Sequence, residues 1–117
     1  MSAGYKPQIM KIAAICSDDL APFFRLLGVD EVYTVEKEDL TKLRSYVRKL
    51  AERKDLAIVI VQLRLFDKVR DEIALIQKLY PSFVPIPDPR DVGEFDVYEF
   101  YRPIIRKYVG FEVTLGE

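Results

Sequence analysis

Short apolar runs alternate along this chain with longer stretches in which apolar residues recur every three or four positions. Runs rich in isoleucine, valine and aromatic residues predict four β-strands, at residues 9–16, 32–35, 56–61 and 83–86. The third run, LAIVIV, is apolar on both faces, which is typical of a central parallel strand covered on both sides. Pro85 indicates an edge position or irregular pairing for the fourth strand, because proline cannot donate a ladder hydrogen bond.

The stripes between these runs predict three amphipathic helices, at residues 20–27, 38–53 and 65–80. Ser17, Asp18 and Asp19 precede the first helix and favour an N-cap, and Gly28 follows it as a C-cap. The resulting order, β-α-β-α-β-α-β, predicts a parallel sheet with right-handed crossovers. We therefore expect a small doubly wound α/β domain built on a four-stranded parallel sheet.

Segments outside this domain have a different composition. We expect a flexible extension at residues 1–8, the α/β domain at 9–87, an acidic linker at 88–96, and a C-terminal amphipathic helix with its tail at 97–117. The helix is predicted by an apolar stripe at helical spacing, made of Val97, Phe100, Tyr101, Ile104, Ile105, Tyr108 and Val109. Pro103 lies on its polar side and costs a continuous helix about 3 kcal/mol. The stripe should therefore be ordered only when it docks, either on its own sheet or on a partner.

Composition narrows the classes of function. The 117 residues suit one domain, and 18 basic against 19 acidic residues give no surplus for nucleic acid. The absence of His and the single Cys exclude His-based catalysis, an intramolecular disulfide and a multi-Cys zinc site. No apolar run reaches the length of a membrane span, so we expect a cytoplasmic protein without direct membrane insertion. The charged stretches at residues 36–39 and 48–55 are interpreted as solvated helix faces.

Ligands of open α/β sheets bind at the carboxyl ends of the strands, so the loop after the first strand is the first candidate site. It contains no glycine to cradle a pyrophosphate, and Asp18 and Asp19 would repel one. The acid pair could hold Mg²⁺ as in a response-regulator receiver, but the third strand ends in Gln62 where a phosphoacceptor Asp is needed. Cys16 ends a buried strand and is interpreted as a core residue. We predict no catalytic residue, no cofactor and no metal site in this chain.

Short matches, in order along the chain, resemble one known family. They are MKIA at 10–13, FRLLGV at 24–29, EVY at 31–33, Tyr80-Pro81, IPD at 86–88 and RKYVG at 106–110. From Met10 to about Val113 the sequence resembles the F subunit of the archaeal and vacuolar-type (A/V-type) rotary ATPases. Because these short matches occur in the same order and at similar spacing, they are more specific together than any one of them is alone.

The resemblance implies a non-catalytic subunit with a receiver-like domain, placed on the central rotor stalk of a complex for ATP synthesis and proton transport. It would bind the coiled coil of the stalk's D subunit, reach toward the A and B subunits of the catalytic head, and lie at the membrane periphery on the cytoplasmic side. We expect Ile104, Ile105, Tyr108 and Val109 to form a partner-facing seam, flanked by Arg102, Arg106 and Lys107. The alternatives are a pseudo-receiver interaction module without a phosphoacceptor and a small enzyme of unknown type.

Overall fold

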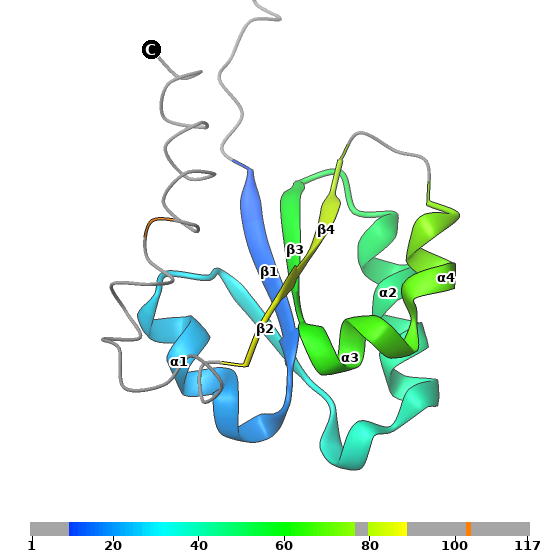
Figure 1. Ribbon diagram of the computed structural model, residues 1–117. Helices are drawn as coiled ribbons and strands as arrows, with labels where there is room; N and C mark the ends of the chain where they lie inside the picture. Colours follow the sequence, from blue (N-terminus) through cyan, green and yellow to red (C-terminus); the bar gives the residue numbers. More distant parts are fainter. Residues whose placement is uncertain (1–9, 77–79, 89–102, 104–117) are drawn as a thin grey trace, which may run out of the picture.

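The computed structural model describes residues 10–76, 80–88 and 103. Its centre is a four-stranded sheet in which every neighbouring pair is parallel, in the order β2-β1-β3-β4 (Figure 1). The strands are β1 (Lys11–Cys16), β2 (Glu31–Thr34), β3 (Leu56–Gln62) and β4 (Ser82–Ile86). The chain runs outward from β1 to β2 and then returns to β3 on the other side of β1. The predicted doubly wound α/β fold is therefore confirmed.

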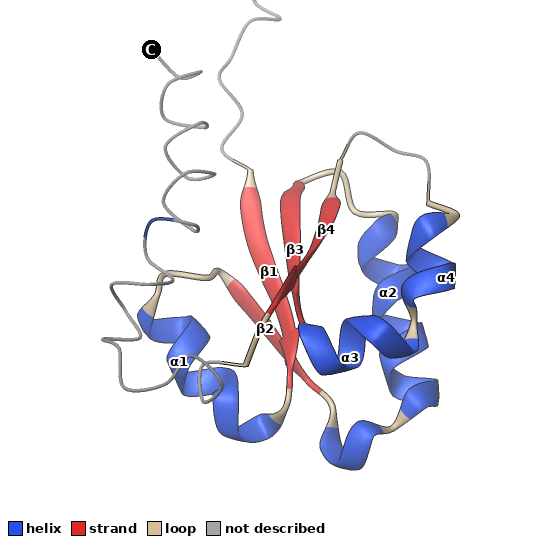
Figure 2. Cartoon of the chain, viewed as in Figure 1, coloured by secondary structure: helices blue, strands red, loops and turns tan. Residues whose placement is uncertain are grey.

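Helices cover both faces of this sheet (Figure 2). On one face, a 3₁₀ turn, η1 (Asp18–Leu20), and the helix α1 (Ala21–Leu26) pack against Ile12, Ala14 and Ile58. On the other, α2 (Leu40–Ala51), α3 (Leu63–Lys68) and α4 (Arg70–Ala74) follow in chain order, and the core there includes Ile15, Leu43 and Val59. From Ile12 in β1 and from Ile58 in β3, side chains alternate between the two cores, as the period of a strand requires. Ala57 and Ile58 share one core, where the pairing of β1 with β3 shifts by one residue.

The strand predictions hold in detail. All seven residues of β3 are buried, which confirms a central strand covered on both sides. Pro85 lies in β4, which pairs with β3 alone among the described strands and so forms an edge.

Local signals explain the first two helical segments. Pro22 lies in the first turn of α1, where a backbone N–H has no helical partner to lose. Gly28 follows that helix with φ of +95°, a left-handed conformation that favours glycine. The side chain of Asp39 caps α2 by accepting a hydrogen bond from the Lys42 amide at 3.1 Å. As a result, α2 spans Leu40–Ala51 and is shorter than the predicted 38–53.

The single helix predicted at residues 65–80 is wrong. The segment forms two short helices, α3 and α4, which are separated at Val69, where φ is −125° and ψ is 23°. Val69 is completely buried, and its amide donates to the Phe66 carbonyl in a tight turn that ends α3. Tyr80 lies beyond the second helix and is 42% exposed. The spacing of apolar residues indicates only which side of a segment faces the core. Because both short helices face the same core, the break at Val69 does not change that spacing.

Candidate functional site

The carboxyl edge of the sheet is where an open α/β fold presents a site, in the crevice at the point where the strand order reverses. Here that point lies between β1 and β3. The residues that meet there are Ser17, directly after β1, Gln62, the last residue of β3, and Asp88, two residues after β4. Gln62 is only 1% exposed, so its amide requires hydrogen-bond partners within the protein.

Gln62 finds these partners on both sides. Its side-chain Oε1 accepts from the Ser17 amide at 2.9 Å, and its Nε2 donates to Asp88 Oδ2 at 3.1 Å. The side chain thus joins the end of β1 to the segment that follows β4. A phosphoacceptor would need a carboxylate that is free to react at this position; the structure has a neutral amide engaged in internal bonds.

The acid pair beside this bridge makes local contacts. Ser17 Oγ donates to Asp19 Oδ1 at 2.5 Å, while Asp18 is exposed in the 3₁₀ turn η1. Among residues 10–76 and 80–88, no three His, Cys, Asp or Glu side chains gather in an arrangement that could hold a metal ion. The predicted N-cap is wrong: Ser17 precedes η1, but neither η1 nor α1 has a side-chain cap hydrogen bond, because the Ser17 hydroxyl is bonded to Asp19 and not to a backbone amide of the turn.

Cys16 is confirmed as a core residue. Its side chain is completely buried within the cluster beneath α1. Burial raises the pKa of the thiol to about 12; the Arg25 charge opposes this, and the Asp19 and Asp18 charges add to it. At neutral pH the group is therefore a protonated thiol, and the nucleophilic thiolate is absent.

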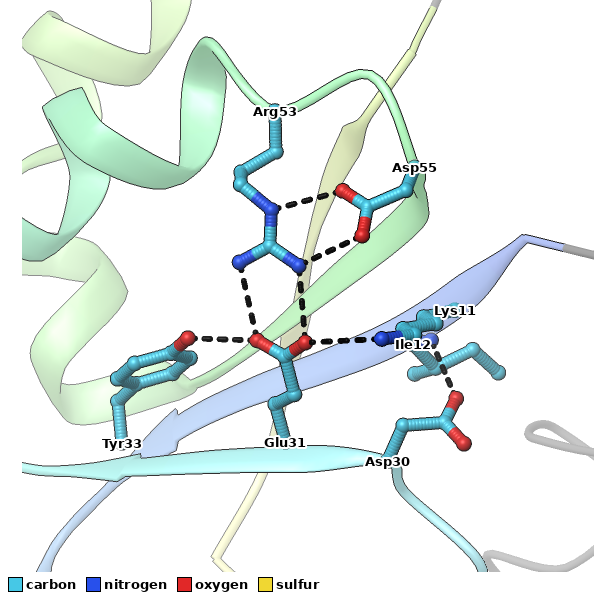
Figure 3. Close-up of polar contacts among 7 residues, drawn as sticks. All are labelled: Lys11, Ile12, Asp30, Glu31, Tyr33, Arg53 and Asp55. Atoms are coloured by element: carbon cyan, nitrogen blue, oxygen red, sulfur yellow. Dashed lines mark hydrogen bonds and ion pairs between the residues drawn. The ribbon is translucent and has the colours of Figure 1, made fainter.

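A second polar cluster lies at the opposite, amino edge of the sheet (Figure 3). We call it the Arg53 cluster; it consists of Arg53, Glu31, Asp55, Tyr33 and Lys11. Arg53 binds Glu31 through two nitrogens, at 3.0 and 2.8 Å, and Asp55 through two contacts, at 2.7 and 2.8 Å. Tyr33 donates to Glu31 at 2.6 Å, and Lys11 Nζ lies 3.8 Å from it. The guanidinium fork thereby ties the start of β2 to the segment that leads into β3.

The protonation states of Glu31, Asp55, Tyr33 and Arg53 are fixed around neutral pH. Hydrogen bonds from Arg53 and Tyr33 lower the pKa of Glu31 to about 2, and the Arg53 hydrogen bond lowers the pKa of Asp55 to about 2. The hydrogen bond to Glu31 raises the pKa of Tyr33 above its ordinary value, and the two carboxylates raise the pKa of Arg53. None of these four groups can exchange a proton at neutral pH, so the arrangement is suited to a structural clamp.

The interpretation of residues 36–39 and 48–55 as solvated helix faces is therefore partly wrong. Arg53 and Asp55 belong to the Arg53 cluster, and Glu38 pairs with Arg64 at 3.0 Å and Lys68 at 3.2 Å. Residues 36–38 form a 3₁₀ turn, in which Lys37 and Glu38 take φ of 50° and 55°. The available signal was topological: Glu31 begins β2 and Asp55 precedes β3, and parallel strands begin at the same edge of a sheet.

The predicted partner seam, at Arg102, Ile104, Ile105, Arg106, Tyr108 and Val109, lies outside the described residues, as do most of the predicted linker and C-terminal helix. Asp88, the first residue of that linker, is described and is bonded to Gln62. None of the helices in the described part of the chain combines the length and apolar character that a bilayer span requires.

Comparison with known proteins identifies the family. The sequence model of the family described as "ATP synthase (F/14-kDa) subunit" matches residues 12–99. The F subunit of the A-type ATP synthase of Pyrococcus abyssi is 33% identical over 106 residues, which cover 89% of this chain and 98% of that protein. The F subunit of the A-type ATP synthase of Thermococcus kodakarensis is 33% identical over 108 residues, which cover 89% of this chain and 98% of that protein. The F subunit of Methanococcus aeolicus is also 33% identical, over 106 residues that cover 89% of this chain and 99% of that protein. This chain therefore belongs to the ATP synthase (F/14-kDa) subunit family.

Proposed function

We propose that this chain is a non-catalytic subunit of the central rotor stalk of an A-type ATP synthase. In this role it binds the coiled coil of the D subunit and couples or regulates rotation through its C-terminal helix. Its working place is the cytoplasmic side of the membrane periphery, within reach of the A and B subunits of the head. Family membership supports the assignment to the synthase, and the relatives are themselves named as its F subunit.

The observation that carries the non-catalytic role is the bridge at Gln62. This amide stands where a receiver-type domain needs a reactive carboxylate, and it is buried and hydrogen-bonded on both sides. The neighbouring Cys16 is a protonated core thiol. A protein-interaction module can retain this α/β fold without catalytic residues at the carboxyl edge of its sheet.

The partner surface is proposed at the seam of the C-terminal segment. Ile104, Ile105, Tyr108 and Val109 share one face at helical spacing, with Arg102, Arg106 and Lys107 beside them. Burying such side chains returns roughly 1.5–3 kcal/mol each. Ordering the backbone costs about 1–2 kcal/mol per residue. Because these sums are similar, a partner that offers an apolar face can decide where the segment docks.

The first experiment is co-expression with the D subunit of the same organism, followed by purification and mass measurement in solution. A stable one-to-one complex is expected. If both proteins are folded and do not associate, the stalk role is overturned, and the pseudo-receiver module that binds elsewhere becomes the better hypothesis.

The seam is tested separately in the same complex. Replacing Ile105 and Val109 together by Ser should weaken the complex at least tenfold, because two apolar anchors are lost. Glu99→Ser, on the polar side of the stripe, is the matched control and should leave affinity unchanged. Unchanged binding of the double variant would remove the seam from the proposal and leave the binding of the D subunit to another face.

A further inference from the structure

The helices α2 and α4 lie on the face of the sheet opposite α1 (Figures 1 and 2). Side chains of α2, of α4 and of the residues directly after them line a groove. Its volume is about 570 Å³. Val47 and Ala51 of α2 are buried at its base, and Ile76 is half-buried beside them. Leu75 stands at its rim with 79% of its surface exposed, the largest exposure among the large apolar side chains described. The groove therefore has an apolar base, and the apolar side chain of Leu75 at its rim is exposed to water.

Charged residues line the α2 wall of the groove at one-turn intervals. Arg44 pairs with Glu72 across the groove, with Nε and Oε2 2.6 Å apart, and so links α2 to α4. Arg48 and Glu52 follow on the same wall and make no ion pair within the described part of the chain. An Arg that precedes a Glu by four residues is the weaker order for pairing along a helix. Both charges can therefore be paired by a group outside the described residues.

From this arrangement we infer that the groove receives an amphipathic α-helix of a neighbouring subunit. The inference rests on the proposed function, since it requires an assembly. The partner helix would place an apolar ridge against Val47, Ala51 and Leu75. Its flank would carry a carboxylate opposite Arg48 and, about one turn away, a cationic side chain opposite Glu52. The twelve residues of α2 span roughly 18 Å, enough to lie along about three turns of such a helix.

This contact differs from the seam in both place and chemistry. The seam lies in the C-terminal segment and is flanked by cations, whereas the groove is formed by α2 and α4 and offers one charge of each sign. The e and g positions of a coiled coil carry both signs of charge beside its buried apolar seam, so a helix of the stalk can supply the two charges that the groove requires. The groove would then fix the orientation of the α/β domain on the stalk.

Thiol labelling can test the groove, because the single cysteine of the chain is expected to be unreactive. Cys16 is completely buried, and its thiol pKa is about 12, so it should not react with a maleimide at neutral pH. Leu75→Cys adds one reactive thiol at the groove. Leu26→Cys, at a site of α1 that is 71% exposed, is the control for reactivity in the isolated chain.

The isolated variants should react at similar rates, and Leu75→Cys should react at least tenfold more slowly in the purified ATP synthase complex. An equal rate in the chain and in the complex would overturn the inference. A slow reaction already in the isolated chain would also overturn it: dependence on protein concentration would indicate a second copy, and independence would indicate this chain's own segment.

The charge requirement is tested in the Leu75→Cys background. Adding Arg48→Glu should restore much of the labelling in the complex, whereas Arg48→Lys should preserve protection. Protection that persists with Arg48→Glu would contradict the proposed carboxylate contact. If the chain does not join the complex at all, the proposed function fails; if it joins and Leu75→Cys stays reactive, only the groove inference fails.

Discussion

The two edges of the sheet are both held by polar contacts, but the contacts differ in kind. At the amino edge, the Arg53 cluster joins charged groups that water partly reaches, and Arg53 has two carboxylate partners. At the carboxyl edge, one neutral amide, Gln62, is sealed from water and joins two segments by itself. Charged, hydrated contacts are redundant and respond to pH; a buried amide has no substitute and does not titrate.

The difference bears on function. The carboxyl edge is where this kind of sheet would bind a ligand, and there the polar groups of Gln62 are used to hold the fold together. At the amino edge, the pKa values of Glu31 and Asp55 are lowered, and those of Tyr33 and Arg53 are raised, so all four lie away from neutrality. The polar groups at both edges thus hold the fold together. The helical surfaces and the C-terminal segment are therefore the better candidates for contacts with partners.

The largest effect is expected at the carboxyl edge. Gln62→Leu keeps the volume and removes both hydrogen bonds, leaving the part-buried Ser17 amide without its Gln62 partner and Asp88 without that donor. Each lost partner costs roughly 1–3 kcal/mol, so the free energy of unfolding should fall by about 4 kcal/mol. Urea unfolding at neutral pH measures it. A loss below about 1 kcal/mol would show that the bridge does not hold this edge.

Gln62→Glu provides a matched variant of nearly equal shape. It brings a carboxylate against Asp88 in a buried place, so the pKa of the introduced carboxyl should be raised by burial and by like charge. A raised folded pKa stabilises below the unfolded pKa, and that contribution is lost as pH rises through the folded value. The variant should therefore be more stable at pH 4 relative to wild type than at pH 7, and urea unfolding at the two pH values measures the difference.

At the amino edge, acid should weaken the fold. Glu31 and Asp55 have folded pKa values of about 2, below their ordinary values of 4.5 and 3.8. Lowered values stabilise above the unfolded pKa, and this stabilisation is lost as pH falls through the folded pKa, so the window runs from about pH 5 to about pH 2. Urea midpoints across this range measure the loss, and Glu31→Gln should flatten the profile.

At neutral pH, Glu31→Gln should lower the free energy of unfolding by about 2 kcal/mol, because charge-assisted hydrogen bonds are lost while Arg53 keeps Asp55. Asp67→Asn, which breaks an exposed pair with Arg70, is the control and should change stability little. Equal effects of both variants in urea unfolding would mean that the Arg53 cluster is no stronger than an ordinary surface pair.

The sequence predicted the sheet well, because strand identity and order depend on local patterns. The apolar run of β3, Pro85 in an edge strand and Gly28 after α1 each express a local rule. The interruption at Val69 was missed because two short helices on one core have the periodicity of one helix.

The polar contacts were missed for a different reason. Glu31 and Arg53 are 22 positions apart, and Gln62 and Asp88 are 26 apart. The sequence indicates that Gln62 excludes phosphorylation but does not assign its bridge, because the bridge depends on the pairing of β3 with β4, which places Ile86 opposite Gln62 and Asp88 two residues beyond. Such contacts follow from topology, and they become predictable only once the strand order is known.

The smallest effect concerns strain at the carboxyl edge. Lys37 takes φ of 50°, a left-handed conformation that costs a non-glycine residue roughly 1–2 kcal/mol. Lys37→Gly removes that cost but loosens the unfolded chain, so a net gain of about 0.5 kcal/mol is expected in thermal or urea unfolding. Lys49→Gly, the same change within α2, should instead lose about 1 kcal/mol. If both variants lose stability, the turn before α2 is not strained. If only Lys37→Gly gains, then the turn that follows β2 at the carboxyl edge holds a strained backbone.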